Sequence, residues 1–162
     1  MKRRMNVSQG IKVRGRVKIT VHDHSTGLDT VVYNGPNLIV NNGLTVFGQL
    51  LAQVAVIPTN NKITSIKFGT DSTAAAAAQT NIIGSLIIQK NISTYTEDVG
   101  GTPGVVAFEL TLDTTEGNGS TINEIGLFTA NSTMVARRVT PAIPKTNLIS
   151  VSVEWRLTFT TS

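Results

Sequence analysis

The chain alternates strictly between apolar and polar side chains from residue 148 to residue 159. The apolar row of this stretch comprises Ile149, Val151, Val153, Trp155, Leu157 and Phe159. The polar row comprises Ser150, Ser152, Glu154, Arg156 and Thr158. Because successive side chains of a strand point to opposite faces, this pattern predicts a β-strand with one buried face. At about 3.3 Å per residue it would span roughly 40 Å, enough to cross a whole sandwich or to reach a neighbouring subunit.

A second alternating stretch lies near the start of the chain, at residues 11–22. Its inward row would comprise Ile11, Val13, Val17, Ile19 and Val21, with Gly15 among them. Its outward row would comprise Lys12, Arg14, Arg16, Lys18 and Thr20. The pattern therefore predicts a strand with one apolar face and one basic face.

The rest of the pattern predicts one helix and several more strands. Asn41 or Asn42 is suited to cap a helix from Gly43 to about Val54. Its apolar stripe would comprise Leu44, Phe47, Leu50, Leu51 and Val54. Apolar runs predict strands at 29–33, 63–69, 82–94, 106–112, 122–128 and 134–139. Turn-forming residues predict a strand break at 34–37 and a hairpin turn at 117–119. The expected fold is a mostly-β, mainly antiparallel β-sandwich with one amphipathic helix near residues 43–54.

Several short motifs lie along the second half of the chain. Residues 123–128 read Asn-Glu-Ile-Gly-Leu-Phe, and they are followed by Ala136-Arg137, Pro141, Lys145-Thr146 and Trp155. This series resembles a widespread group of tailed-bacteriophage virion proteins, which are small β-rich modules of tail fibres, neck appendages or head decorations. Residues 41–44 and 66–70 fit the same pattern. Each motif is a folding motif, so the resemblance implies a structural protein and not an enzyme.

The positive charge is concentrated at the start of the chain. Seven of the fourteen Lys and Arg residues precede the first acid, Asp23, and these are Lys2, Arg3, Arg4, Lys12, Arg14, Arg16 and Lys18. The chain carries a net charge of +4, so residues 23–162 carry −3. We therefore expect a basic extended arm at residues 1–10 and a single sandwich domain at residues 11–162.

Three hypotheses could explain the role of the basic residues. They could dock on an acidic surface of a partner subunit, form a solvated outer face, or bind nucleic-acid phosphates. No aromatic residue precedes Tyr33, so this segment offers no ring for stacking on bases. Docking is favoured, a solvated face comes second, and nucleic acid comes third but is the leading alternative binding function.

Two groups of residues could carry chemistry. His22 and His24 share a strand face around Asp23 and could bind a metal, but a closed site needs further ligands and the chain has no cysteine. Glu124 lies in an apolar strand and could be a general acid or base. Its alternative is a structural acid that accepts backbone hydrogen bonds or pairs with Arg137 or Arg138. We predict no catalytic residue, no cofactor and no metal.

The predicted function is that of a non-enzymatic structural protein of a tailed-phage virion. It would dock on neighbouring virion subunits as a head-decoration (cement) protein or as a neck, tail or fibre adaptor, and form a homo-oligomer such as a trimer. Only 15% of residues are charged, which suits a surface covered by partners. A glycan-binding surface module is a further alternative. No secretory signal or membrane-length apolar run is recognisable, so we expect synthesis in the host bacterial cytoplasm.

Overall fold

Nine antiparallel strands and one helix make up the described part of the chain. The computed structural model describes residues 10–52 and 61–161. In chain order the elements are β1 (Ile11–Asp23), β2 (Leu28–Ile39), α1 (Asn41–Ala52), β3 (Ile63–Gly69), β4 (Leu86–Asn91), β5 (Thr94–Glu97), a 3₁₀ turn (Val99–Gly101), β6 (Val105–Leu112), β7 (Thr121–Thr129), β8 (Met134–Pro144) and β9 (Ile149–Thr161).

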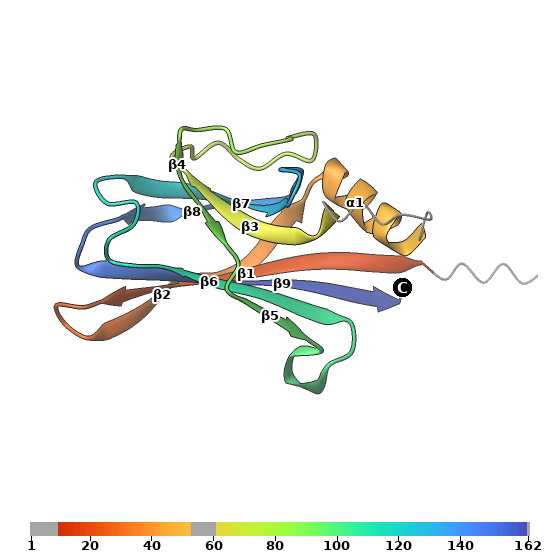
Figure 1. Cartoon of the computed structure of the whole chain (residues 1–162), viewed down its shortest axis with the longest axis horizontal. Coiled ribbons are helices and arrows are strands. Elements are labelled where there is room, and N and C mark those ends of the chain that lie inside the picture. The colour runs from red at the N-terminus through yellow and green to blue at the C-terminus, as the bar shows by residue number, and fades with distance from the viewer. Residues whose placement is uncertain (1–9, 53–60, 162) are drawn as a thin grey trace, which may run out of the picture.

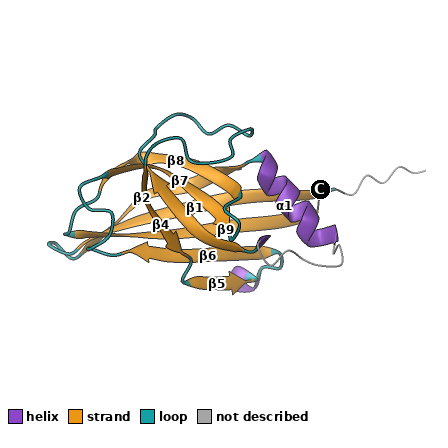
Figure 2. Cartoon of the chain, turned by 45° about the horizontal axis from the view of Figure 1, so that its top comes forward, coloured by secondary structure: helices purple, strands orange, loops and turns teal. Residues whose placement is uncertain are grey.

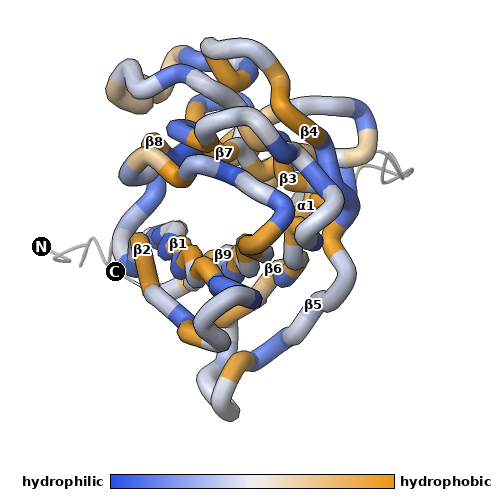
Figure 3. Tube along the Cα trace, turned by 90° about the vertical axis from the view of Figure 1, so that its left-hand side faces the viewer, coloured by the Kyte–Doolittle hydropathy of each residue, from blue (hydrophilic) through white to orange (hydrophobic). Residues whose placement is uncertain are grey.

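The strands hydrogen-bond in the order β4-β3-β7-β8-β2-β1-β9-β6-β5, and this sheet curls into two facing walls (Figure 1). One wall is formed by β1, β9 and β6 and the other by β3, β7 and β8, as the end-on view also shows (Figure 3). The prediction of a mostly-β antiparallel sandwich with one helix is therefore confirmed. The predicted arm at residues 1–10 lies almost entirely outside the described residues.

The main core lies between the two walls. Trp155 of β9 is completely buried, and Val17 and Ile19 of β1 join it from the neighbouring strand. The long final strand keeps the predicted alternation, with its apolar row inward. In β1 the inward row also holds, except that Ile11 at the strand's start is 65% exposed. The start of β1 therefore extends beyond the edge of the core.

The strand break predicted at residues 34–37 is wrong. β2 runs unbroken through Gly35 and Pro36, and it leaves β1 near Asn37 to join β8 at Leu38 and Ile39. The carbonyl oxygen of Pro36 accepts hydrogen bonds from Tyr33 and Arg138 and so points away from β1. The nitrogen of a strand residue points to the same side as its carbonyl, so the N–H that proline lacks would face an edge where β2 has no paired strand among the described residues. β2 thereby links the two walls of the sandwich.

The hairpin turn predicted at residues 117–119 is also wrong. β6 pairs with β5 and β9, whereas β7 pairs with β3 and β8, so the connection between them crosses from one wall to the other. Lys145 holds this crossing: its backbone bonds Gly119 and Ser120, and its Nζ donates to Asn118 Oδ1 at 3.0 Å. Burial lowers the pKa of Lys145, although Glu116 and Asp113 oppose this.

The helix packs across one end of the sandwich, near the end of β9 (Figure 2). It begins at Asn41, two residues before the predicted start, and Gly43 lies against β8 so closely that a Cβ there would lie 2.2 Å from the carbonyl oxygen of Val135. Phe47 is buried as predicted and meets the ring of Phe159, but Leu44 and Leu50 of the predicted stripe are exposed. Val46 is buried in the core instead. The side chain of Leu51 and residue Val54 lie outside the described residues.

Candidate docking surface

The outward row of β1 carries the basic side chains that the alternation predicted. Lys12, Arg14, Arg16 and Lys18 are all exposed, and each alternates with an inward neighbour such as Val17. Lys2, Arg3 and Arg4 lie outside the described residues, so their role stays a prediction. The structure thus brings four of the seven predicted docking residues together on one strand.

The neighbouring strand adds a fifth cation that the sequence reasoning did not place with them. Arg156 of β9 lies directly opposite Arg16 in the β1–β9 register, and Lys18 lies opposite Glu154. The alternation alone predicted that Arg156 points outward, because Arg156 belongs to the polar row of β9. What the sequence alone could not supply was the pairing of the first strand with the last. We call Lys12, Arg14, Arg16, Lys18 and Arg156 the basic face.

Most charges of the basic face have no acidic partner in the part of the chain that the structure describes. Arg16 donates through Nε to Asn34 Oδ1 at 2.9 Å, and Arg156 pairs with Glu154. Within residues 10–52 and 61–161, no ion pair or hydrogen bond reaches the side chains of Lys12, Arg14 or Lys18. A shallow depression of about 260 Å³ lies among Arg16, Lys18, Asn34, Glu154 and Arg156. Grouped exposed charges of one sign raise the local concentration of oppositely charged molecules.

Glu124, the candidate general acid or base, is buried, and four hydrogen-bond donors surround its carboxylate. Its carboxylate accepts the backbone N–H groups of Asp71 (3.2 Å), Ile83 (3.0 Å) and Gly84 (2.7 Å), and the Nε of Arg137 at 2.8 Å. Four donors use the acceptor capacity of a carboxylate. The hypothesis that Glu124 is a structural acid is thus supported in both its forms, and the pairing partner is Arg137 and not Arg138.

This buried pair fastens a long loop, residues 70–85, onto the outer face of the β7–β8 wall. Arg137 Nη1 donates to the carbonyl oxygen of Thr73 at 3.0 Å and to Gln79 Oε1 at 3.1 Å. At the start of the loop, hydrogen bonds from Thr73 hold the pKa of Asp71 below its ordinary value. Gly69 leaves room for the carboxylate, since a Cβ there would lie 2.7 Å from Glu124 Oε1. A small apolar cluster of Val40, Phe128, Met134 and Ile82 fills the rest of this layer.

His22 and His24 do lie together, with ring centroids 4.5 Å apart. Each ring already has a partner: His22 Nδ1 is 2.7 Å from Asp29 Oδ1, and His24 Nε2 is 3.1 Å from Ser150 Oγ. Asp23 caps the β1–β2 turn by accepting the N–H of Ser25. Among the residues that the structure describes, no three His, Cys, Asp or Glu side chains gather as a metal site would require.

Residues 42–159 match the family model described as phage tail-collar fibre protein, N-terminal, and this match spans well over half of the chain. The chain belongs to this family. It is therefore a structural component of a phage tail fibre, and the predicted resemblance to tailed-phage virion proteins is confirmed. Membership also implies contact with other tail proteins of the virion. No curated protein and no solved structure matches the chain.

The motifs that suggested this family have structural roles in the tail-fibre fold. Asn123 donates to the carbonyl oxygen of Thr70, and Glu124 and Arg137 hold the loop at residues 70–85. Trp155 fills the core. In the described residues no helix is long and apolar enough to span a membrane.

Proposed function

We propose that this tail-fibre protein attaches to a neighbouring tail protein through its basic face. The supporting observation is the row of exposed cations on β1, three of which have no partner in the described part of the chain. Charges that stabilise nothing within the chain are free to steer and orient an acidic partner. The pairing of β1 with β9 has no register shift from Ile11 to Asp23, so the cations are held at regular spacing along the strand.

The arm at residues 1–10 would extend the same attachment. Lys2, Arg3 and Arg4 lie seven to nine residues before Ile11 in the sequence, and they would contribute three more positive charges to the attachment. Removing residues 1–10 is expected to leave the melting temperature of the body at residues 11–162 unchanged and to reduce incorporation into particles. Loss of the fold on this truncation would show that the arm serves folding instead.

The finer placement is part of the proposal. We infer a fibre adaptor in the tail, formed as a closed homo-oligomer such as a trimer and synthesised in the host cytoplasm. The competing placement, a head-decoration or cement protein, requires hundreds of copies per particle, whereas an adaptor requires about a dozen. Quantitative mass spectrometry of purified particles separates the two. A native mass of the isolated protein tests the trimer.

Nucleic acid and glycan remain the rival ligands. The aromatic residues of β9, Trp155 and Phe159, belong to its inward row, so neither offers a platform beside the basic face. Purified protein is therefore expected not to retain duplex DNA at physiological salt. Purified particles, in contrast, are expected to release the protein as salt is raised, because exposed charge pairs are screened. Retention of DNA with a steep salt dependence would contradict docking and favour nucleic-acid binding.

A further inference from the structure

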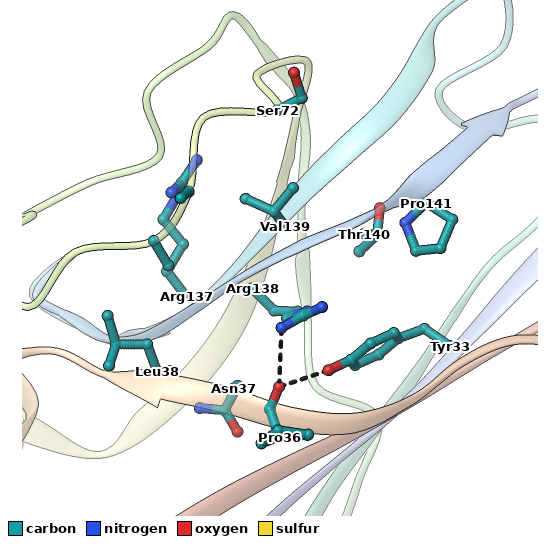
Figure 4. A pocket seen from close by; sticks show the side chains of 12 residues that line it. Tyr33, Pro36, Asn37, Leu38, Ser72, Arg137, Arg138, Val139, Thr140 and Pro141 are labelled. Carbon is teal, nitrogen blue, oxygen red and sulfur yellow. Dashed lines mark hydrogen bonds between the residues drawn. The ribbon is translucent and has the colours of Figure 1, made fainter.

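A groove opens where β2 and β8 separate (Figure 4). The two strands pair at Leu38–Arg137 and Ile39–Ala136, and beyond these pairs the facing edge of each strand has no strand partner among the described residues. The groove has a volume of about 720 Å³. One side is formed by Tyr33, Pro36, Asn37 and Leu38 of β2 and the other by Arg137 to Pro141 of β8, with Ser72, Ala74 and Ala75 of the loop above. We call it the β2–β8 groove.

The opposite seam of the sandwich is closed by the chain itself. There β4 continues into β5, so one stretch of backbone bonds first to β3 and then to β6. Ile92 and Ser93 bond both walls at the crossing, and Lys90 Nζ lies 2.5 Å from Glu116 and 3.4 Å from Asp113. Nothing equivalent in the described residues spans the β2–β8 groove except Arg138, whose Nη1 lies 3.4 Å from the carbonyl oxygen of Pro36.

Buried polar atoms without a partner gather around this groove. Of the five such side-chain atoms in the described residues, four are Asn37 Nδ2, Asn37 Oδ1, Arg137 Nη2 and Arg138 Nε. The fifth belongs to Trp155 in the core. Arg137 is completely buried, and its Nη2 lies 3.8 Å from Asp71 Oδ1, too far for a hydrogen bond. Because a buried unpaired polar group is destabilising, the unpaired Nε of Arg138, which faces Tyr33 and Pro36 in the groove, indicates a site completed by another molecule.

The charge of the groove selects the ligand chemistry. None of its lining residues is acidic. The charge of Arg137 is matched by Glu124, but no carboxylate in the described part of the chain lies within ion-pair distance of Arg138. Its guanidinium stacks 4.2 Å from the centre of the Tyr33 ring, which fixes its orientation. A planar, oriented guanidinium without a counter-ion is suited to a carboxylate.

The groove is continuous with the basic face. Pro36 lies between them: Arg16 of the basic face is its register partner on β1, and Arg138 reaches its carbonyl oxygen from the other side. An extended segment that lies along the free edge of β8 would meet Arg138 at the point where β2 and β8 part, close to Arg16 of the basic face. Edge addition of this kind supplies main-chain hydrogen bonds, while side-chain pairs supply specificity.

We propose that the β2–β8 groove takes an extended acidic segment of a neighbouring tail protein, which lies along the free edge of β8 and places a carboxylate on Arg138. This inference rests on the proposed attachment and names a second, more specific contact for the same acidic partner. Entry of the segment would rearrange the groove side chains and provide hydrogen-bond partners for Asn37. The basic face provides steering, and the groove provides recognition.

The test in solution uses the full chain and a short polyglutamate peptide, followed by NMR of the arginine Nε–H signals. The peptide is expected to shift the Arg138 signal, and Arg138→Gln is expected to weaken binding by about tenfold. Arg138→Lys keeps the charge but loses the planar guanidinium, so its affinity for the peptide should lie between those of the parent and of Arg138→Gln. The matched control is Lys62→Gln, which removes an exposed charge outside the groove and should change the affinity by less than about twofold. Polyglutamine should not bind.

Equal losses for Arg138→Gln and Lys62→Gln, or binding without a shift at Arg138, would overturn the groove proposal. A shift produced by duplex DNA and not by polyglutamate would replace the acidic peptide with nucleic acid. In particles, Arg138→Gln should reduce incorporation. If it does not, while charge reversal on the basic face does, the groove proposal fails and the proposed attachment stands; if neither does, both fail.

Discussion

The Glu124–Arg137 pair and the basic face both consist of charged side chains, but the charges of the pair are buried and matched, whereas most charges of the basic face are exposed and unmatched in the described part of the chain. The buried pair lies under the loop at residues 70–85, where each charge meets its counter-charge and backbone groups take up the remaining hydrogen bonds of the carboxylate. The basic face lies on the outside of the β1–β9 wall, where Lys12, Arg14 and Lys18 meet no counter-charge among the described residues. The first set is explained by contacts within the fold, and for the second we propose a partner.

The contrast gives a physical way to separate structural charges from functional ones. A buried charge must be matched within the chain because desolvation is otherwise prohibitive, so its partners show what it does. An exposed charge is well solvated and needs no match, so its grouping with other charges is informative. Arg138 falls between these cases, since it is half-buried and has no counter-ion in the described part of the chain.

The largest effect is expected from breaking the buried pair. Glu124→Gln keeps the size of the side chain but leaves Arg137 buried without a counter-charge. The free energy of unfolding should fall by about 3–5 kcal/mol, measured by urea denaturation. Hydrogen exchange at the N–H groups of Ile83 and Gly84 should become faster, because both donate to this carboxylate. The partly exposed ion pair between Glu154 and Arg156 supplies the control: Glu154→Gln should lower stability by less than about 1 kcal/mol. Equal effects at the two sites would erase the contrast.

The two sides of β9 make the same comparison between adjacent residues. Trp155 is fully buried and Arg156 points outward, so Trp155→Ala should destabilise by about 3–5 kcal/mol and Arg156→Ala by less than about 0.5 kcal/mol. Trp155 is the only tryptophan, so its fluorescence reports on this position alone. Emission like that of free indole, with easy quenching by iodide, would show that the residue is not in the core.

A smaller, pH-dependent effect is expected at the closed seam. The ion pair with Lys90 lowers the pKa of Glu116, so its stabilisation is present above the ordinary value of 4.5 and is lost as the pH falls through the lowered pKa. Burial opposes the charge of Lys90, but Glu116 and Asp113 raise its pKa overall, so its share is present below 10.5 and is lost above the raised value. The melting temperature of Glu116→Gln should lie below that of the parent near neutral pH and converge with it in acid. A constant difference at all pH values would mean that the pair does not stabilise the seam.

Periodicity was sufficient for most of the fold and for part of the site. The alternation at residues 11–22 and 148–159 predicted two strands and their faces, because side-chain direction follows from spacing alone. It could not show that these strands are neighbours, which is what brings Arg156 to Arg16. Turn chemistry misled at Pro36, where a free strand edge removes the need for an N–H donor, and at Gly117 and Gly119, where a crossing between walls uses the same residues as a hairpin. The β2–β8 groove depends on where two strands part, and local sequence carries no signal for that.

The most direct test of the proposed attachment is charge reversal at Arg14, which has no partner within the described residues and lies opposite Thr158. Arg14→Glu should leave the melting temperature nearly unchanged, lower incorporation into particles by about tenfold, and allow release at lower salt. Lys62→Glu changes the net charge equally at an exposed position away from the basic face and should incorporate normally. Normal incorporation of Arg14→Glu, or an equal loss with Lys62→Glu, would contradict attachment through the basic face.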